Sequence, residues 1–147
     1  MSEETIRLVL VALDGSARAP RVLAVANDLA ARYGAPLALL RVIEIPPEFP
    51  PAGAGFAEDR LPAYLAKTAS AELAALAKSY DIAAESMLVR KGQPWRAILE
   101  AADELDADII VMGSHGYSGL DHLLGTTAGK VANLAARNVF IVHERGL

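Results

Sequence analysis

The feature that most constrains this 147-residue sequence is an alternation of short apolar runs with longer segments of helical periodicity. Apolar runs of strand length lie at 7–13, 37–43, 108–112 and 138–142, and a more polar run at 84–89 has the character of an edge strand. Segments with helical spacing lie between them, at 17–33, 59–80, 94–105 and 127–136. Strands that alternate with helices pair in parallel through right-handed crossovers. We therefore predict a doubly wound α/β fold with a five-stranded parallel sheet and about four helices on its two faces.

Composition limits the classes of partner. The chain is 53% hydrophobic and 22% charged, and it has a net charge of −4 without a lysine or arginine cluster. It contains no cysteine, which excludes disulfides, thiolate catalysis and cysteine-ligated metals. No stretch approaches the ~20 apolar residues that cross a membrane. We expect a single domain over residues 1–147 in the cytoplasm, with neither nucleic acid nor a membrane as its partner.

A loop rich in glycine and hydroxyl side chains follows the run at 108–112. Its glycines and hydroxyl residues are Gly113, Ser114, Gly116, Ser118, Gly119, Gly125, Thr126 and Thr127. Glycine exposes backbone N–H groups, and the start of the next helix adds the positive end of a helix dipole. We expect Thr126 to cap that helix. A strand, a glycine loop and a helix start together favour binding of a phosphate.

Two common phosphate motifs do not match this loop. The dinucleotide fingerprint requires Gly-x-Gly-x-x-Gly, whereas the glycines at 113, 116 and 119 are spaced by three. A Walker A loop requires four residues before Gly-Lys-Ser/Thr, whereas three residues separate Gly125 from Gly129 and Val131 follows Lys130. Neither class of site is predicted.

Asp14 follows the first apolar run directly, in the tripeptide Asp14-Gly15-Ser16. In open α/β sheets, ligands bind outside the carboxyl ends of the strands. We interpret Asp14 as a ligand-binding residue and Ser16 as the cap of the next helix.

These motifs together resemble the universal stress protein family. The resemblance rests on Gly113-Ser-His-Gly116 followed by Gly125-Thr126, on the strand that ends in Asp14-Gly15-Ser16, and on the strand that ends at 42–44. It covers nearly the whole chain. The family pattern has nine residues between the second and third glycines, and this sequence has eight, 117–124. The resemblance implies the strand order 3-2-1-4-5, which would place Asp14 beside the glycine loop.

The resemblance also implies a site for ATP. Asp14 would bind the ribose, the backbone of Val42 would contact the adenine, Ala12 and Leu13 would form apolar walls, and the loop would surround the phosphates. The implied site consists of Ala12, Asp14, Val42, Gly113, Ser114, His115, Gly116, Tyr117, Ser118, Gly119, Gly125, Thr126, Thr127 and Ala128.

The charges of the loop residues affect how strongly the loop could bind phosphates. Tyr117 and Asp121 stand where relatives frequently carry basic residues, and Lys130 and His122 are the nearby cations. We therefore expect Mg²⁺ or Mn²⁺ to accompany ATP, because such ions bind through phosphate oxygens with few protein ligands.

Three functions stay open at this point. No nucleophile-base pair is visible, so the first is an ATP-binding protein of stress response or energy-linked signalling that is not a dedicated catalyst. The second is the same fold without nucleotide, acting through an unknown protein partner, and the short spacer favours it. The third is a slow ATPase. We further expect a homodimer through the apolar edge strand at 138–142, because pairing with a second copy would cover that edge.

Overall fold

The computed structural model describes residues 5–44, 60–114 and 125–144, with side chains of the middle range described from residue 63 onwards. Strands and helices alternate along these ranges. In chain order they are β1 (Val9–Leu13), α1 (Ala19–Tyr33), β2 (Leu37–Ile43), α2 (Arg60–Ser79), β3 (Ser86–Lys91), α3 (Pro94–Leu105), β4 (Ile109–Gly113), α4 (Thr126–Leu134) and β5 (Asn138–Val142).

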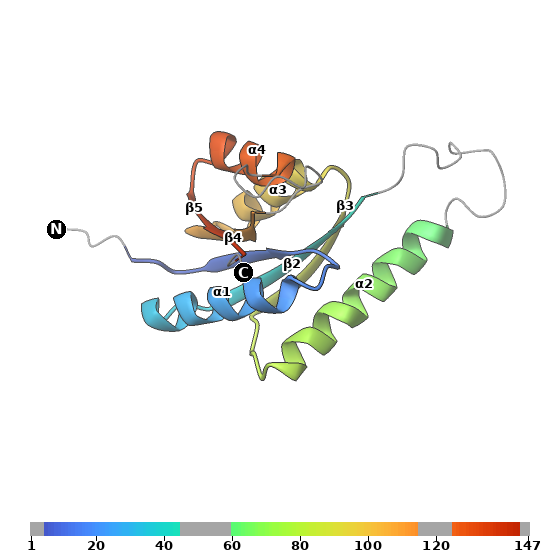
Figure 1. The fold of residues 1–147 in the computed structure, drawn as a ribbon, viewed down its shortest axis with the longest axis horizontal. Coiled ribbons are helices and arrows are strands. Elements are labelled where there is room, and N and C mark those ends of the chain that lie inside the picture. The colour runs from blue at the N-terminus through green and yellow to red at the C-terminus, as the bar shows by residue number, and fades with distance from the viewer. Residues whose placement is uncertain (1–4, 45–59, 115–124, 145–147) are drawn as a thin grey trace.

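The strands form one parallel sheet in the order β3-β2-β1-β4-β5. Helices α1 and α2 cover one face of the sheet, and α3 and α4 cover the other (Figure 1). The predicted fold and strand order are therefore confirmed. The order reverses between β1 and β4, which makes this pair the topological switch point of the sheet.

The central strand β1 has both faces buried. Val9, Val11 and Leu13 pack in the core beneath α1 and α2, whereas Leu10 and Ala12 pack in the core beneath α3 and α4. This two-sided burial explains why the strand is an unbroken apolar run, since successive side chains of a strand point to opposite faces.

The boundaries of β3 differ from the prediction. This strand was expected at 84–89, and it lies two residues later because β2 aligns it, from Ala38 opposite Ser86 to Ile43 opposite Lys91. The chain then turns at Gly92, whose φ of 131° favours glycine. The expectation that this strand lies at an edge is confirmed.

Both predicted helix caps were wrong. Thr126 is the first residue of α4, and Gly125 occupies the N-cap with φ −61° and ψ 164° and no side-chain hydrogen bond. Ser16 does not cap α1 either, because Arg18 holds that position. The observed N-cap lies one residue before Thr126 in α4 and two residues after Ser16 in α1. Gly125 has no side chain that could bond the first N–H groups of α4.

Candidate functional site

The ends of β1 and β4 define the candidate site. The two strands are neighbours, with Val9 opposite Ile109 and Val11 opposite Val111. Because parallel strands end at the same edge of a sheet, Asp14 after β1 and Ser114 after β4 both lie at the carboxyl edge, at the switch point. Residues about one hundred positions apart in the sequence thus arrive at one place.

Asp14 forms a tight turn with Ser16. Its Oδ1 atom accepts hydrogen bonds from the backbone N–H of Ser16 at 2.9 Å and from the Ser16 hydroxyl at 2.5 Å. The Ser16 hydroxyl oxygen in turn accepts the N–H of Arg18 at 3.2 Å. Within the described ranges, Oδ2 of Asp14 has no such partner, and the residue is exposed. The turn therefore fixes one carboxylate oxygen and leaves the other for a ligand.

Arg41 packs against this turn from β2. A Cβ atom on Gly15 would lie 2.7 Å from Nη2 of Arg41, so the guanidinium occupies the space above that glycine. The same guanidinium donates through Nη1 to Glu72 of α2 at 3.1 Å. Sequence reasoning missed this residue, because only the pairing of Leu13 with Arg41 brings it beside the turn.

The start of α4 supplies the donors of the site. The N–H of Ser114 donates to the carbonyl of Val142 at 3.0 Å, and the N–H of Gly125 donates to the carbonyl of Ser114 at 2.8 Å. Neither N–H is therefore open to a ligand. The first helical hydrogen bond of α4 runs from Gly129 to Gly125 at 2.8 Å.

Three backbone donors precede that bond. The N–H groups of Thr126, Thr127 and Ala128 have no acceptor in the described part of the chain, as is usual in the first turn of a helix. The two threonines add hydroxyl groups. This open turn lies directly after the end of β4, because Gly125 is bonded to Ser114. An anion at this place would meet several N–H groups and a positive helix dipole.

The expected apolar residues divide between the two faces of the sheet. Ala12 and Val42 are half-buried and pack beneath α3 and α4, as does the fully buried Ala128. Leu13 lies in the opposite core beneath α1 and α2, so Ala12 and Leu13 do not form one wall. The remaining predicted residues lie outside the described ranges: His115, Gly116, Tyr117, Ser118 and Gly119, together with Asp121, His122 and the rest of the eight-residue spacer.

Trp95 brings two cations to the start of α3 and α4. The charged carbon of Arg96 lies 5.2 Å from the centre of the Trp95 ring, and Nζ of Lys130 lies 4.9 Å from it. The ring also packs with the core beneath α3 and α4. Among the described residues, its buried Nε1 has no hydrogen-bond partner. Sequence reasoning noted Lys130 and missed Arg96, although a cation in the first turn after a strand is a usable signal.

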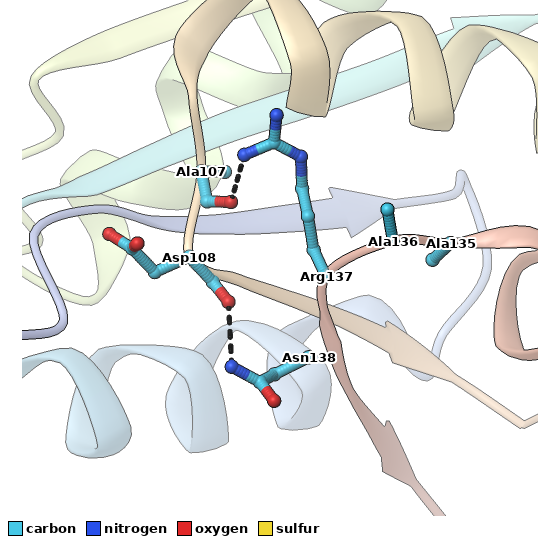
Figure 2. Close-up of a pocket in the computed structure, with 6 residues that line it drawn as sticks. All are labelled: Ala107, Asp108, Ala135, Ala136, Arg137 and Asn138. Carbon is cyan, nitrogen blue, oxygen red and sulfur yellow. Dashed lines mark hydrogen bonds between the residues drawn. The ribbon is translucent and has the colours of Figure 1, made fainter. Parts of the chain in front are cut away.

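Another hollow of the described surface lies at the amino edge of the sheet, before β4 and β5 (Figure 2). It has a volume of about 550 Å³ and is lined by Ala107, Asp108, Ala135, Ala136, Arg137 and Asn138. Its polar groups are used within the fold: Asp108 accepts the N–H of Arg7 at 2.7 Å, and Arg137 donates to the Ala107 carbonyl at 2.6 Å. We therefore interpret this hollow as structural. A smaller cavity of about 200 Å³ lies at the carboxyl edge, between the Asp14 turn and Arg41.

The described residues were also considered as metal ligands and as membrane-spanning helices. Among the described residues, no group of three histidine, cysteine, aspartate or glutamate side chains is placed to hold a metal ion. No helix in the same ranges is both long enough and apolar enough to cross a bilayer.

The fold and the position of the site define an open α/β protein whose candidate ligand site lies at the switch point of its sheet. The chain belongs to the universal stress protein family, whose sequence model matches residues 5–143. It is 34% identical over 138 residues to a universal stress protein of Thermus aquaticus, encoded in the QAH/OAS sulfhydrylase 3′ region, and the match covers 93% of this chain and 98% of that protein.

Solved structures of the family include nucleotide complexes. A universal stress protein in complex with cAMP superposes with a TM-score of 0.66 and 29% identity, over 95% of this chain and 98% of that one. The universal stress protein of Archaeoglobus fulgidus in complex with dAMP has a TM-score of 0.60 and 26% identity, over 92% of this chain and 96% of that one.

Proposed function

We propose that residues 1–147 form one universal-stress-type domain that binds ATP or a related adenine nucleotide in the cytoplasm, for stress response or energy-linked signalling. The observation that carries the proposal is that the open first turn of α4 and the Asp14 turn lie at the same edge of the sheet, after the neighbouring strands β4 and β1. Within the described residues, three N–H groups without an acceptor and a carboxylate oxygen without a donor lie at one edge, where phosphates need donors and ribose hydroxyls need an acceptor. The cAMP and dAMP complexes of the two relatives support this proposal.

Each part of the nucleotide has a proposed contact. The N–H groups of Thr126, Thr127 and Ala128 bind phosphate oxygens, Oδ2 of Asp14 accepts from the ribose, and the adenine lies against Ala12 and Val42. The other residues of the proposed site belong to the glycine loop. Mg²⁺ or Mn²⁺ would be held by the phosphates and water, because the described residues provide no cluster of acidic or histidine ligands.

Dedicated catalysis is not part of this proposal. No nucleophile-base-orienter set is evident among the described residues of the site, so ATP hydrolysis would be slow and incidental. The alternative is a family member that has lost its nucleotide and acts through protein contacts, and one observation favours it: the eight-residue spacer in the glycine loop.

The first experiment is native mass spectrometry of the freshly purified protein, followed by calorimetric titration with ATP and Mg²⁺. We expect bound or titratable ATP in the wild-type protein. Asp14→Ala should weaken binding about tenfold, because a hydrogen bond to a charged carboxylate is lost. Ser16→Ala is the matched control, since it removes a hydroxyl from the same turn and leaves the carboxylate in place.

The outcome separates the two functions. Weaker binding in Asp14→Ala together with unchanged binding in Ser16→Ala supports the nucleotide site. A folded wild-type protein that binds no nucleotide at millimolar ATP would reject it in favour of a protein-contact function.

A further inference from the structure

Arg96 and Lys130 are two cations that have no carboxylate partner among the described residues, whereas most of the described arginines have one. Six other arginines form ion pairs: Arg7, Arg18, Arg32, Arg41, Arg90 and Arg137. Within the described ranges, Arg96 and Lys130 have no acidic side chain within 4.0 Å, and both lie over one aromatic ring. A ring face attracts a cation without cancelling its charge, so both charges stay available to an anion.

The fold directs both cations towards the candidate site. Helices α3 and α4 each follow a parallel strand, so both begin at the carboxyl edge of the sheet. Arg96 is in the first turn of α3, and Lys130 is four residues after Thr126 in α4. Helical side chains lean towards the N-terminus, so the Lys130 side chain leans towards the first turn of α4.

The shared ring also keeps the two charges together. Both lie within 5.2 Å of the centre of Trp95, whose own position is fixed by the core beneath α3 and α4. Two cations on different helices thus share one ring, and Lys130 belongs to the helix whose first turn carries the open N–H groups. This arrangement is a property of the packing of α3 on α4, since the two residues are 34 positions apart in the sequence.

We infer that Arg96 and Lys130 recognise the phosphates beyond the first, so that the site selects nucleotides by phosphate number. This inference rests on the proposed nucleotide site and deepens it. The open turn of α4 can hold one phosphate through N–H groups, and each further phosphoryl group adds negative charge that the Trp95-bound cations stabilise. Affinity should therefore rise from AMP to ADP to ATP.

The test is a calorimetric titration of the wild-type protein and four variants with AMP, ADP and ATP, in the absence of divalent metal. Arg96→Gln and Lys130→Gln should each weaken ATP about fivefold, the effect of one partly exposed charge pair, and change AMP less than about twofold. Lys67→Gln is the matched control: it removes one exposed cation from α2 and should change neither nucleotide. Lys130→Arg should restore the preference for ATP.

Other outcomes overturn the inference. Equal weakening of AMP and ATP would show that the cations only support the local structure, and an unchanged ATP affinity would show that they do not reach the phosphates. Arg96 and Lys130 are exposed, so the variants should fold, and circular dichroism checks this. If the wild-type protein binds none of the three nucleotides in the titration with Mg²⁺ either, the proposed function itself fails, and this inference fails with it. Binding that occurs only with Mg²⁺ would overturn this inference alone, because the metal and not the two cations would then offset the phosphate charge.

Discussion

At the scale of single residues, the backbone N–H of Thr126 is a donor that can be removed with little disturbance. Proline is well tolerated as the first residue of a helix, and Gly125 already has the extended conformation that a residue before proline prefers. Thr126→Pro should therefore fold normally and bind ATP about tenfold more weakly than Thr126→Ala, because only proline removes the N–H. Calorimetry on both variants checks this expectation.

The comparison with Thr126→Ala isolates the N–H from the hydroxyl. Equal affinities in the two variants would mean that the first turn of α4 does not contact the phosphate. Matching circular dichroism spectra would show that the helix start is intact in both.

Parts of the candidate site could be predicted from single residues and others could not. The positions of Asp14 and Gly113 could be predicted, because Asp14 directly follows one apolar strand and Gly113 ends another. Parallel strands end at the same edge of a sheet, so both residues lie there. Ala12 and Leu13 were predicted as apolar walls of the site, and they lie on opposite faces of the sheet, as the alternation of side chains along a strand requires. Arg41 depends on the pairing of β1 with β2, which local sequence does not contain.

At the scale of elements, β5 is the edge strand on which the proposed homodimer depends. Phe140 on this strand is 43% exposed, and its neighbours alternate in burial. Pairing of β5 with a second copy would cover this side chain and the open strand edge. The wild-type protein should therefore be a dimer at micromolar concentration, and Phe140→Glu should be a monomer, as measured by light scattering.

The opposite edge of the sheet supplies the control. Met87 on β3 is also 43% exposed, so Met87→Glu places the same charge on the other edge strand. A dimer that survives Phe140→Glu but not Met87→Glu would assign the interface to β3, and a monomeric wild type would reject the dimer.

The ends of elements were harder to predict than the elements themselves. Strand β2 was predicted with its observed bounds, because Pro36 and a continuous apolar run mark it in the sequence. Strand β3 begins two residues later than predicted. Its polar sequence does not mark where the strand begins and ends, and pairing with β2 determines its bounds. The start of α4 could not be fixed by capping preference, because bonding of Gly125 to Ser114 sets it.

At the scale of the whole molecule, burial of the sheet on both faces determines stability. Leu10 is fully buried in the central strand, away from the proposed ligand contacts. Leu10→Ala should lower the free energy of unfolding by about 2–5 kcal/mol, because it removes apolar contacts and leaves a cavity. Chemical denaturation at one protein concentration measures this loss.

Leu134→Ala makes the same change at a side chain that is 58% exposed, and it should shift the free energy of unfolding by less than about 0.5 kcal/mol. Similar losses in the two variants would contradict a core that is centred on β1.

Trp95 is the single tryptophan of the chain, and it lies where two cations and the starts of two helices meet. Indole fluorescence responds to the electric field around the ring. The protein therefore carries one intrinsic optical probe, placed by its own packing beside the edge where an anion would arrive. A change of charge there is observable in the unmodified molecule, without a label and without background from any other tryptophan.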